Sequence, residues 1–362
     1  MEIKHGIVGR TTEGLFRYKA WPTVTRDKDG VLYAVCSGHR RAHVCPFGKN
    51  LMFTSHDGGE TWSSPIIVND TYLDDRDAGI TAWGDSTLFL TWFSSDDRDY
   101  RRRVWRCADI DSPLSLAMQE FWKTIPEEEY NEGDWCRISH DNGQTWSEAR
   151  RTPVSAPHGA IHLKDGRILY VGTHTAYDPS LPKGTIQAFT SSDEGKTWQH
   201  LSQVRFLKEW KGVPVVGPCE PHCVELPNGD LLVAIRAVNG DSKDFQRITL
   251  VRSKDGGKTW EDPQVLDNMI GSPPHFCLRK DGALVLSYGR RIEPFGEYVR
   301  ISYDNGYTWT EDMMIRSAPD WDLGYPASVE LPDGNMLTVY YQKFEDDPFN
   351  SILYTKWEFP KK

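Results

Sequence analysis

The sequence predicts an all-β protein, a six-bladed β-propeller whose blades are four-stranded antiparallel sheets. Two repeats lead to this prediction. The octapeptide S-x-D-x-G-x-T-W occurs five times, starting at Ser55, Ser139, Ser191, Ser253 and Ser302. A second repeat, in which two apolar segments flank a short polar turn, occurs six times and alternates with the octapeptides. Alternating repeats of this kind are typical of propellers, whose blades each contain four strands.

The octapeptide predicts a tight turn that leads into a strand. In copies such as SHDNGQTW, the Asp and Asn side chains can bond to their own backbone, and the glycine tolerates left-handed backbone. The Thr-Trp pair that follows favours a strand and brings one large ring to bury against a neighbouring strand. Each octapeptide therefore predicts two strands and the turn between them.

The second repeat predicts the other two strands of each blade. Most of its turns contain Asp-Gly or Asn-Gly, which are strong hairpin signals. The six copies begin at Pro22, Ala78, His158, Pro221, Pro274 and Pro326. Two strands from the hairpin and two around the octapeptide make four strands per blade, and six hairpins make six blades.

The two ends of the chain are expected to complete the last blade. No octapeptide follows the sixth hairpin, and only the segment SILYTKWEF from Ser351 remains. This blade therefore lacks a strand, which we expect the residues around Ile3–Val8 to supply by pairing with the C-terminal strand. Such pairing closes the ring and removes an exposed sheet edge.

Residues 1–362 are expected to form this single domain, with one large insertion. The insertion covers about residues 94–134, after the second strand of blade two, and is expected on the face that carries the pocket. Ser112 and Pro113 precede an apolar stretch within it, a pattern that predicts a short helix. We expect Trp105, Phe121 or Trp122 of this insertion to help cap a bound substrate.

Composition argues against several classes of partner. The net charge is -10, and no basic stretch with interleaved aromatic residues offsets it, so nucleic acid is not expected as a partner. No apolar stretch is long enough to span a membrane. The N-terminal segment MEIKHGIVGRTTEG lacks the apolar core of a signal peptide, so a cytoplasmic location is expected. No cofactor or metal is expected, and the oligomeric state is left open.

Alignment of the six hairpin turns brings a set of polar residues to one equivalent position. Eight residues before the Asp or Asn of each turn lie Trp21, Asp77, Pro157, Glu220, Pro273 and Tyr325. In a propeller this position lies where each inner strand begins, around the central channel, whereas the octapeptides lie on the opposite face. Asp77, Glu220 and Tyr325 are therefore expected to converge as an acid, a base and a nucleophile.

The loops that leave the second strands supply positive charge to the same face. Their candidate substrate-binding arginines are Arg40, Arg236, Arg290 and Arg291. Planar guanidinium groups bind carboxylates through two hydrogen bonds, so this cluster predicts an acidic sugar as ligand. The histidines expected near the pocket are His43, His158, His222 and His275. None has the spacing of a metal ligand, so we expect them to form hydrogen bonds in the pocket.

At these residues the chain resembles the sialidase (neuraminidase) superfamily with Asp-box repeats. The segment GPCEPHCVELPNGDLLVAIR is similar to the family pattern at Glu220 and Arg236, and DLGYPASVELPDG is similar at Tyr325. The resemblance implies that Tyr325 is the nucleophile, that Glu220 activates it, and that three arginines clamp the substrate carboxylate. A neutral phenol also avoids charge repulsion with a sugar that carries a carboxylate at its anomeric carbon.

The sequence departs from this family at two places. The family's N-terminal Arg-Ile-Pro aligns with Ala20-Trp21-Pro22, so Arg17 or Arg40 would have to supply the first arginine. The loop that carries the family's acid contains no carboxylate here, so Asp77 is the expected acid, with His43 as second choice. The third arginine is left open among Arg290, Arg291 and Arg300.

The sequence thus predicts a sialidase-like exo-glycosidase that hydrolyses a terminal sialic acid or a related acidic sugar from a glycan. One alternative is a glycosidase or lyase for another acidic glycan, with a histidine as acid or base. The other is a sugar-binding propeller without catalysis.

Overall fold

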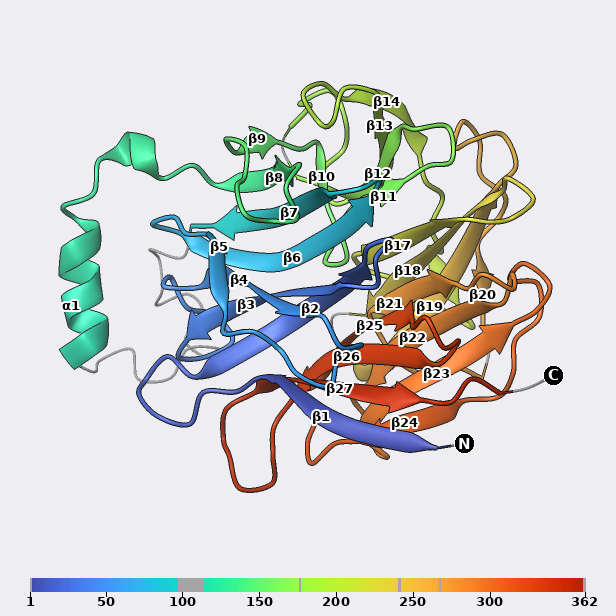
Figure 1. The fold of residues 1–362 in the computed structure, drawn as a ribbon. Helices are drawn as coiled ribbons and strands as arrows, with labels where there is room; N and C mark the ends of the chain where they lie inside the picture. The colour runs from blue at the N-terminus through green and yellow to red at the C-terminus, as the bar shows by residue number, and fades with distance from the viewer. Residues whose placement is uncertain (1, 97–112, 176, 240–241, 267, 361–362) are drawn as a thin grey trace.

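The computed structural model describes residues 2–96, 113–175, 177–239, 242–266 and 268–360. Its strands form the predicted six-bladed propeller of antiparallel sheets (Figure 1). The inner strands of neighbouring blades contact one another around a ring, except between blades three and four, where the second strand of blade three contacts the inner strand of blade four. The candidate site lies at one end of these inner strands.

The first three blades contain the following strands. Blade one consists of β2 (Tyr18–Arg26), β3 (Leu32–Arg40), β4 (Lys49–Ser55) and β5 (Ile66–Asn69). Blade two consists of β6 (Asp74–Trp83), β7 (Thr87–Ser95), β8 (Gly133–Ser139) and β9 (Arg150–Arg151). Blade three consists of β10 (Val154–Ser155) and β11 (Ile161–His162), which both pair with β12 (Ile168–His174), then β13 (Ile186–Ser191) and β14 (Gln199–Gln203).

The last three blades are more regular. Blade four consists of β17 (Cys219–Glu225), β18 (Leu231–Asn239), β19 (Ser242–Ser253) and β20 (Gln264–Val265). Blade five consists of β21 (Pro274–Leu278), β22 (Leu284–Arg290), β23 (Gly296–Ser302) and β24 (Met313–Ser317). Blade six consists of β25 (Gly324–Glu330), β26 (Met336–Gln342), β27 (Ser351–Trp357) and the N-terminal strand β1 (Ile3–Gly9).

Both ends of the chain meet in blade six. Strand β1 pairs antiparallel with β27, from Ile3 opposite Trp357 to Gly9 opposite Ile352. The strand predicted around Ile3–Val8 therefore supplies the missing fourth strand of this blade. The two termini lie near each other at the same end of the molecule (Figure 1).

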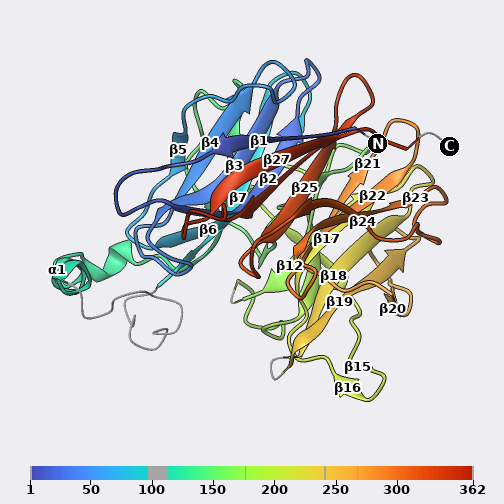
Figure 2. The same ribbon diagram turned by 90° about the horizontal axis from the view of Figure 1, so that it is seen from below.

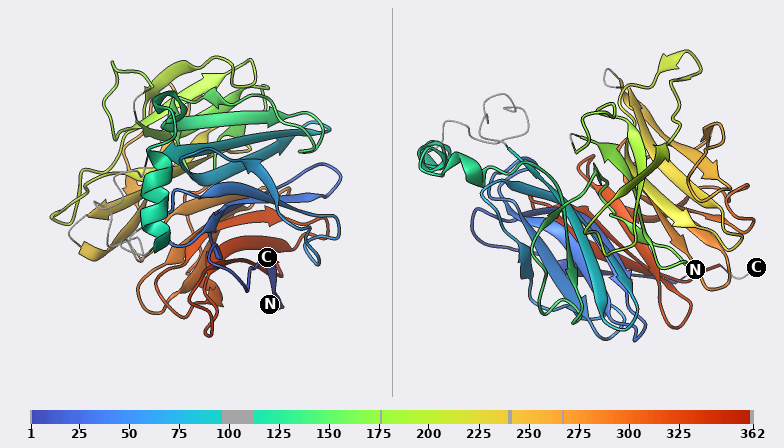
Figure 3. Two further views of the ribbon diagram at one scale, coloured as in Figure 1. Left: turned by 90° about the vertical axis from the view of Figure 1, so that its left-hand side faces the viewer. Right: turned by 90° about the horizontal axis from the view of Figure 1, so that it is seen from above.

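The insertion in blade two contains the predicted helix. Helix α1 (Pro113–Trp122) is followed by a single 3₁₀ turn (Glu127–Glu129) and projects away from the blades (Figure 2). It extends from the face to which β7 returns, which is the predicted pocket face (Figure 3). The ring of Phe121 lies 6.4 Å from that of Tyr72, between centroids, and Trp122 is buried. The capping role remains a prediction, and two residues named for this insertion, Trp105 and Ser112, lie outside the described residues.

A second excursion is the short hairpin of β15 (Glu209–Trp210) and β16 (Val213–Pro214), which precedes blade four. Among the described helices, none is long and apolar enough to cross a membrane.

The octapeptide turns share one hydrogen-bond network. In the third copy the Ser191 hydroxyl donates to Asp193 (2.8 Å), the Gly195 N–H donates to that hydroxyl (2.8 Å), and the Thr197 N–H and hydroxyl both donate to the Asp193 carboxylate (2.9 and 2.6 Å). The other four copies repeat these contacts. Because each aspartate is used within its own turn, at the end of the third strand, the octapeptides support the scaffold on the face opposite the pocket.

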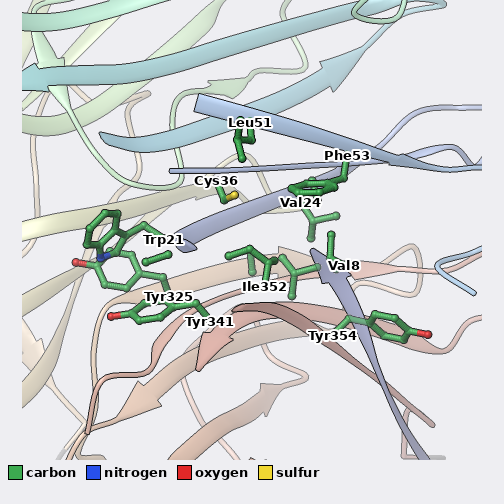
Figure 4. Packing of buried hydrophobic residues seen from close by; sticks show 14 of the residues in the cluster. Val8, Trp21, Val24, Cys36, Leu51, Phe53, Tyr325, Tyr341, Ile352 and Tyr354 are labelled. Atoms are coloured by element: carbon green, nitrogen blue, oxygen red, sulfur yellow. The ribbon is translucent and has the colours of Figure 1, made fainter. Parts of the chain in front are cut away.

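The core lies between the blades. Each of the six blade interfaces is filled by one cluster of buried apolar side chains. The cluster between blades one and six joins residues from both chain ends, and Figure 4 shows Val8 and Tyr354 at one end of it and Trp21, Tyr325 and Tyr341 at the other. The proposed nucleophile Tyr325 is thus part of the core that closes the ring.

Prediction for the octapeptide glycine. Gly195 has a φ of +77°, and a Cβ added there would lie 3.1 Å from the ring of Phe89 in the preceding blade. Gly166 has a φ of +90°, with nothing within 4 Å of an added Cβ. Gly166→Ala should lower the free energy of unfolding by about 1 kcal/mol through backbone strain alone. Gly195→Ala should cost about 1–3 kcal/mol more, because the added methyl overpacks the interface. Urea unfolding of both variants measures the difference in the free energy of unfolding. Equal losses of stability in the two variants would show that the turn at Gly195 does not pack closely against blade two.

Candidate active site

Four of the six equivalent positions share an unusual backbone. Trp21, Asp77, Glu220 and Tyr325 have φ values of +54°, +49°, +50° and +52°. Left-handed backbone is rare for side chains other than glycine, asparagine and aspartate, and groups of such residues occur at functional sites. The other two positions hold prolines, Pro157 and Pro273, whose rings fix φ near -65° and exclude this conformation.

Each of these four residues lies in a β-bulge with the same register. In β17, Cys219 lies opposite Arg236, and His222 lies opposite Ala234. The chain therefore advances by three residues along β17 where it advances by two along β18, which is one extra residue on β17. The same shift occurs around Trp21, Asp77 and Tyr325. A bulge bends the strand and redirects a side chain. The repeated bulge thus redirects the side chain at the equivalent position of four inner strands, near the end at which each strand begins.

The bulges bring Glu220 and Tyr325 into direct contact across blades four and six. The Tyr325 hydroxyl donates a hydrogen bond to Glu220 Oε1 over 2.7 Å. Arg236, in β18 of blade four, donates from Nη1 to Glu220 Oε2 over 2.6 Å. The structure therefore places the predicted pair together and assigns Arg236 as the cation beside the carboxylate.

Burial and nearby negative charges keep the phenol neutral, and Arg236 together with hydrogen bonds keeps the carboxylate ionised. Burial, followed by the negative charges of Glu220 and Asp77, raises the pKa of Tyr325 well above its ordinary value. Burial alone would raise the pKa of Glu220, but the charge of Arg236 and the hydrogen bonds from Tyr325 and Arg236 outweigh it and lower that pKa. Glu220 is thus a proton acceptor already bonded to a hydroxyl proton.

Asp77 provides a second carboxyl group, and its pKa is shifted in the opposite direction to that of Glu220. Burial raises the pKa of Asp77 to about 7. The positive charge of Arg76 lowers this pKa, and the negative charge of Glu220 raises it further. Its side chain is buried, and Oδ1 has no hydrogen-bond partner among the described residues. Two neighbouring carboxyls with separated pKa values are the arrangement expected for an acid and a base.

The neighbouring arginines at the end of β22 have different surroundings. Arg291 donates from Nη2 to the Tyr341 hydroxyl (2.9 Å) and from Nε to the Leu323 carbonyl (3.0 Å), and its guanidinium carbon is 5.5 Å from the centre of the Tyr325 ring. Arg290 instead lies over Tyr298, at 5.8 Å, and donates to the Glu293 carbonyl. Arg291 is therefore the member of the pair that borders the site.

Three other candidate arginines are held elsewhere by carboxylates. Arg40 is fully buried and binds both oxygens of Asp74, over 2.5 and 2.7 Å. Arg17 pairs with Asp347, and Arg300 pairs with Asp312. The expectation that Arg40 binds a substrate carboxylate is corrected by this geometry, because both ends of its guanidinium are already bound and no part of it is exposed.

Two residues near the site were not chosen from the sequence. Trp21 occupies the equivalent position of blade one, and its ring contacts those of Tyr325 (6.4 Å) and His43 (4.9 Å). The guanidinium carbon of Arg76 lies 4.3 Å from the Trp21 ring centre. Trp21 occupies one of the six aligned positions, but it is not ionisable. The only feature of the sequence that indicates Arg76 is its place directly before Asp77 in the segment DDRDAG.

Three of the predicted histidines form a buried cluster beside Tyr325. The rings of His222 and His275 stack at 4.4 Å, and His158 lies 4.8 Å from His275 and 6.3 Å from Tyr325, between ring centres. Burial lowers the pKa of His222 to about 3 and also lowers the pKa values of His158 and His275 well below normal. They remain neutral at pH 7, which argues against a role as general acids. In the described part of the chain, no set of three or more His, Cys, Asp or Glu residues is arranged to hold a metal ion.

Comparisons with known proteins agree with this architecture. The profile of the BNR repeat-like domain family matches residues 116–339, and that of the BNR/Asp-box repeat matches residues 53–64. A sialidase from Bacteroides fragilis is 22% identical over 319 residues, which cover 80% of this chain and 53% of that protein. The chain thus spans about half the length of this relative.

Solved structures share the fold at low sequence identity. A Dyadobacter fermentans protein of unknown function has a TM-score of 0.76 and 21% identity, with 99% of each chain covered. The NanB sialidase of Streptococcus pneumoniae has a TM-score of 0.68 and 14% identity, covering 98% of this chain and 70% of that one. An alpha-L-arabinofuranosidase of Fusarium graminearum has a TM-score of 0.64 and 13% identity, with 97% of each chain covered.

Prediction for Arg40. Arg40→Met leaves Asp74 buried without the guanidinium that binds both of its oxygens, so the free energy of unfolding should fall by about 3–5 kcal/mol, measured in urea. Arg290→Met, which removes an arginine that donates to a backbone carbonyl, should change it by no more than about 0.5 kcal/mol. Full stability of Arg40→Met together with weaker substrate binding would restore Arg40 to the substrate site.

Proposed function

The chain belongs to the BNR repeat-like family of sialidase-like propellers, and we propose that it is an exo-glycosidase that releases a terminal sialic acid or a related acidic sugar from a glycan. The observation that carries the proposal is the hydrogen bond from Tyr325 to Glu220, with Arg236 on the other carboxylate oxygen. In this arrangement a candidate nucleophile, Tyr325, and a candidate base, Glu220, are already in contact before substrate binds.

In the proposed first step, the Tyr325 oxygen forms a bond to the anomeric carbon while Glu220 takes the phenolic proton. Asp77 donates its proton to the glycosidic oxygen as the bond to the leaving group breaks. In the second step, water releases the sugar from Tyr325, Asp77 accepts the proton of the water, and Glu220 returns its proton to the phenol. Each group ends the cycle in its starting protonation state.

An acidic substrate is favoured by the charge around the phenol. Arg236 is paired with Glu220, but Arg291 hydrogen-bonds to a phenol and a carbonyl, and no salt bridge to a carboxylate is found for it within the described residues. A guanidinium beside the nucleophile that lacks an anionic partner suits a substrate carboxylate. The neutral state of Tyr325 suits the same substrate, because the nucleophile approaches without repelling it.

A second candidate follows from the two carboxyl groups themselves. Asp77 and Glu220 have pKa values shifted in opposite directions, which is the pattern of a glycosidase that needs no tyrosine nucleophile. In that case the substrate is a neutral sugar, as for the similar arabinofuranosidase structure. Trp21, an aromatic ring where the sialidase pattern has an arginine, favours this candidate.

Prediction for the nucleophile. Wild-type protein is expected to cleave an aryl sialoside, and Tyr325→Phe should lower its kcat by about 10³-fold or more, because the bond-forming oxygen is removed. Tyr298→Phe, which removes a hydroxyl bonded to Pro294 in blade five, should keep kcat within about twofold. The assay set includes deaminated sialic acid, ketodeoxyoctonate, glucuronide, rhamnoside and arabinofuranoside aryl glycosides. Turnover of a neutral glycoside that survives in Tyr325→Phe would select the two-carboxylate candidate.

Prediction for pH dependence. Asp77, with its pKa raised to about 7, holds its proton below pH 7, so kcat/KM should fall about tenfold per pH unit above pH 7. The acid limb should lie below the usual range of a glutamate, because Glu220 must stay ionised. Asp77→Asn should abolish the alkaline limb, and should slow a disaccharide more than a nitrophenyl glycoside, whose leaving group needs no acid. Persistence of the alkaline limb in Asp77→Asn would assign the acid to another group.

A further inference from the structure

His158 of blade three lies at the centre of the ring of blades. Residues of all five other blades surround it, namely Thr23, Gly79, His222, His275 and Tyr325, of blades one, two, four, five and six. The approach to blade two needs a glycine, because a Cβ added at Gly79 would lie 2.7 Å from the carbonyl carbon of His158. The imidazole of His158 is therefore on the channel axis, with its ring centre 6.3 Å from that of the candidate nucleophile Tyr325.

The contacts of Thr23 assign the ring hydrogen of His158. Burial lowers the pKa of His158 well below its ordinary value, so at pH 7 the ring is neutral and only one nitrogen carries hydrogen. The Thr23 hydroxyl lies 3.1 Å from the Pro157 carbonyl oxygen and 3.2 Å from His158 Nδ1. A carbonyl oxygen only accepts, so the single hydroxyl hydrogen satisfies that contact. Both contacts are hydrogen bonds only if His158 Nδ1 donates to Thr23, which leaves Nε2 as an acceptor.

The two neighbouring histidines have the opposite arrangement. The Phe276 N–H donates to His222 Nδ1 over 2.8 Å. The Ser328 N–H donates to His275 Nδ1 over 3.2 Å. A backbone N–H can only donate, so these two neutral rings carry their hydrogen at Nε2. Within this cluster of three, His158 is thus the ring that offers a lone pair at Nε2.

This lone pair has no protein partner at the channel axis. His158 is 2% exposed, and its Nε2 has no hydrogen-bond partner among the described residues. Asp77 Oδ1, two residues before Gly79, is likewise buried without such a partner there. A buried acceptor that makes no hydrogen bond costs about 1–3 kcal/mol, which a donor group bound at the axis would offset.

We propose that His158 Nε2 is the acceptor of a channel subsite that binds one hydroxyl group, supplied by the terminal sugar or by a water molecule. The inference rests on the proposed function in placing a sugar beside Tyr325. It adds a neutral contact, because a lone pair accepts a hydroxyl hydrogen and repels the oxygens of a carboxylate or a carbonyl. His158 is then a specificity residue that takes no part in proton transfer.

The first test reads the hydrogen position directly. Long-range proton–nitrogen correlation spectra of the ¹⁵N-labelled wild-type protein should show His158 Nε2 unprotonated, and Nε2 of His222 and His275 protonated. His158 is assigned from its nuclear Overhauser contacts to Thr23, so the measurement needs no variant. A nitrogen shift that moves to the hydrogen-bonded value when sialic acid is added identifies a sugar hydroxyl as the donor. A hydrogen-bonded value without sugar, unchanged by it, identifies water. A protonated Nε2, or an Nε2 that is hydrogen-bonded in neither state, would overturn the inference.

The second test measures the binding of sialic acid and its monodeoxy analogues by calorimetry. If the donor is a sugar hydroxyl, His158→Phe should weaken binding of sialic acid by about 3- to 10-fold, and one analogue should lose the same factor in wild type and nothing further in His158→Phe. If the donor is water, no analogue should show this coupling. His162→Phe is the matched control in the same blade, since it keeps a ring to stack on Trp83, and it should change affinity by less than about twofold.

The two proposals fail separately. If wild type neither cleaves a glycoside nor binds sialic acid, but His158 Nε2 is a hydrogen-bonded acceptor in the sugar-free protein, the proposed function fails and the inference stands on water. If wild type cleaves the sialoside and His158 Nε2 is protonated, only the inference fails.

Discussion

The left-handed bulge at the start of four inner strands is the constraint on which the site depends. A regular strand would alternate its side chains between the two neighbouring blades, so residues at the channel end would point into the blade interfaces. The extra residue in each bulge breaks this alternation at Trp21, Asp77, Glu220 and Tyr325. Positive φ at these residues is unfavourable by about 1–3 kcal/mol each, and it persists because the surrounding sheets hold both sides of the bulge.

That constraint is supported by packing far from the channel. The octapeptide networks fix the turn after the third strand, and their glycines approach side chains of the preceding blade, as Gly195 approaches Phe89. Apolar clusters fill each interface between blades, and the cluster of blades one and six includes the ring of Tyr325. The reactive phenol is thus held by the same contacts that close the ring, which limits its motion and pre-organises its hydrogen bond to Glu220.

Charge pairing then divides the arginines between scaffold and site. Arg40 is neutralised by Asp74 and buried, and Arg236 is paired with Glu220 at the site. Arg291 is placed by a phenol and a carbonyl, and Arg76 packs on an indole with its Nη1 3.9 Å from Asp74 Oδ2. Burial raises the pKa of Asp77 to about 7, so below that pH this carboxyl is mostly neutral and the proposed site carries excess positive charge, which favours an anionic ligand.

The sequence by itself determined the propeller, the number of blades and the position at which Asp77, Glu220 and Tyr325 come together. This was possible because the repeats are local, since adjacent residues specify each turn and its flanking strands. The same spacing within each hairpin then identifies equivalent positions in all six blades. The partners of the arginines could not be obtained this way. Arg40 and Asp74 are far apart in the chain, and Arg290 and Arg291 are adjacent yet lie beside Tyr298 and Tyr325 respectively. Only the tertiary structure decided which cations reach the phenol, because ion pairing and burial depend on which side chains the bulges and blade interfaces bring together.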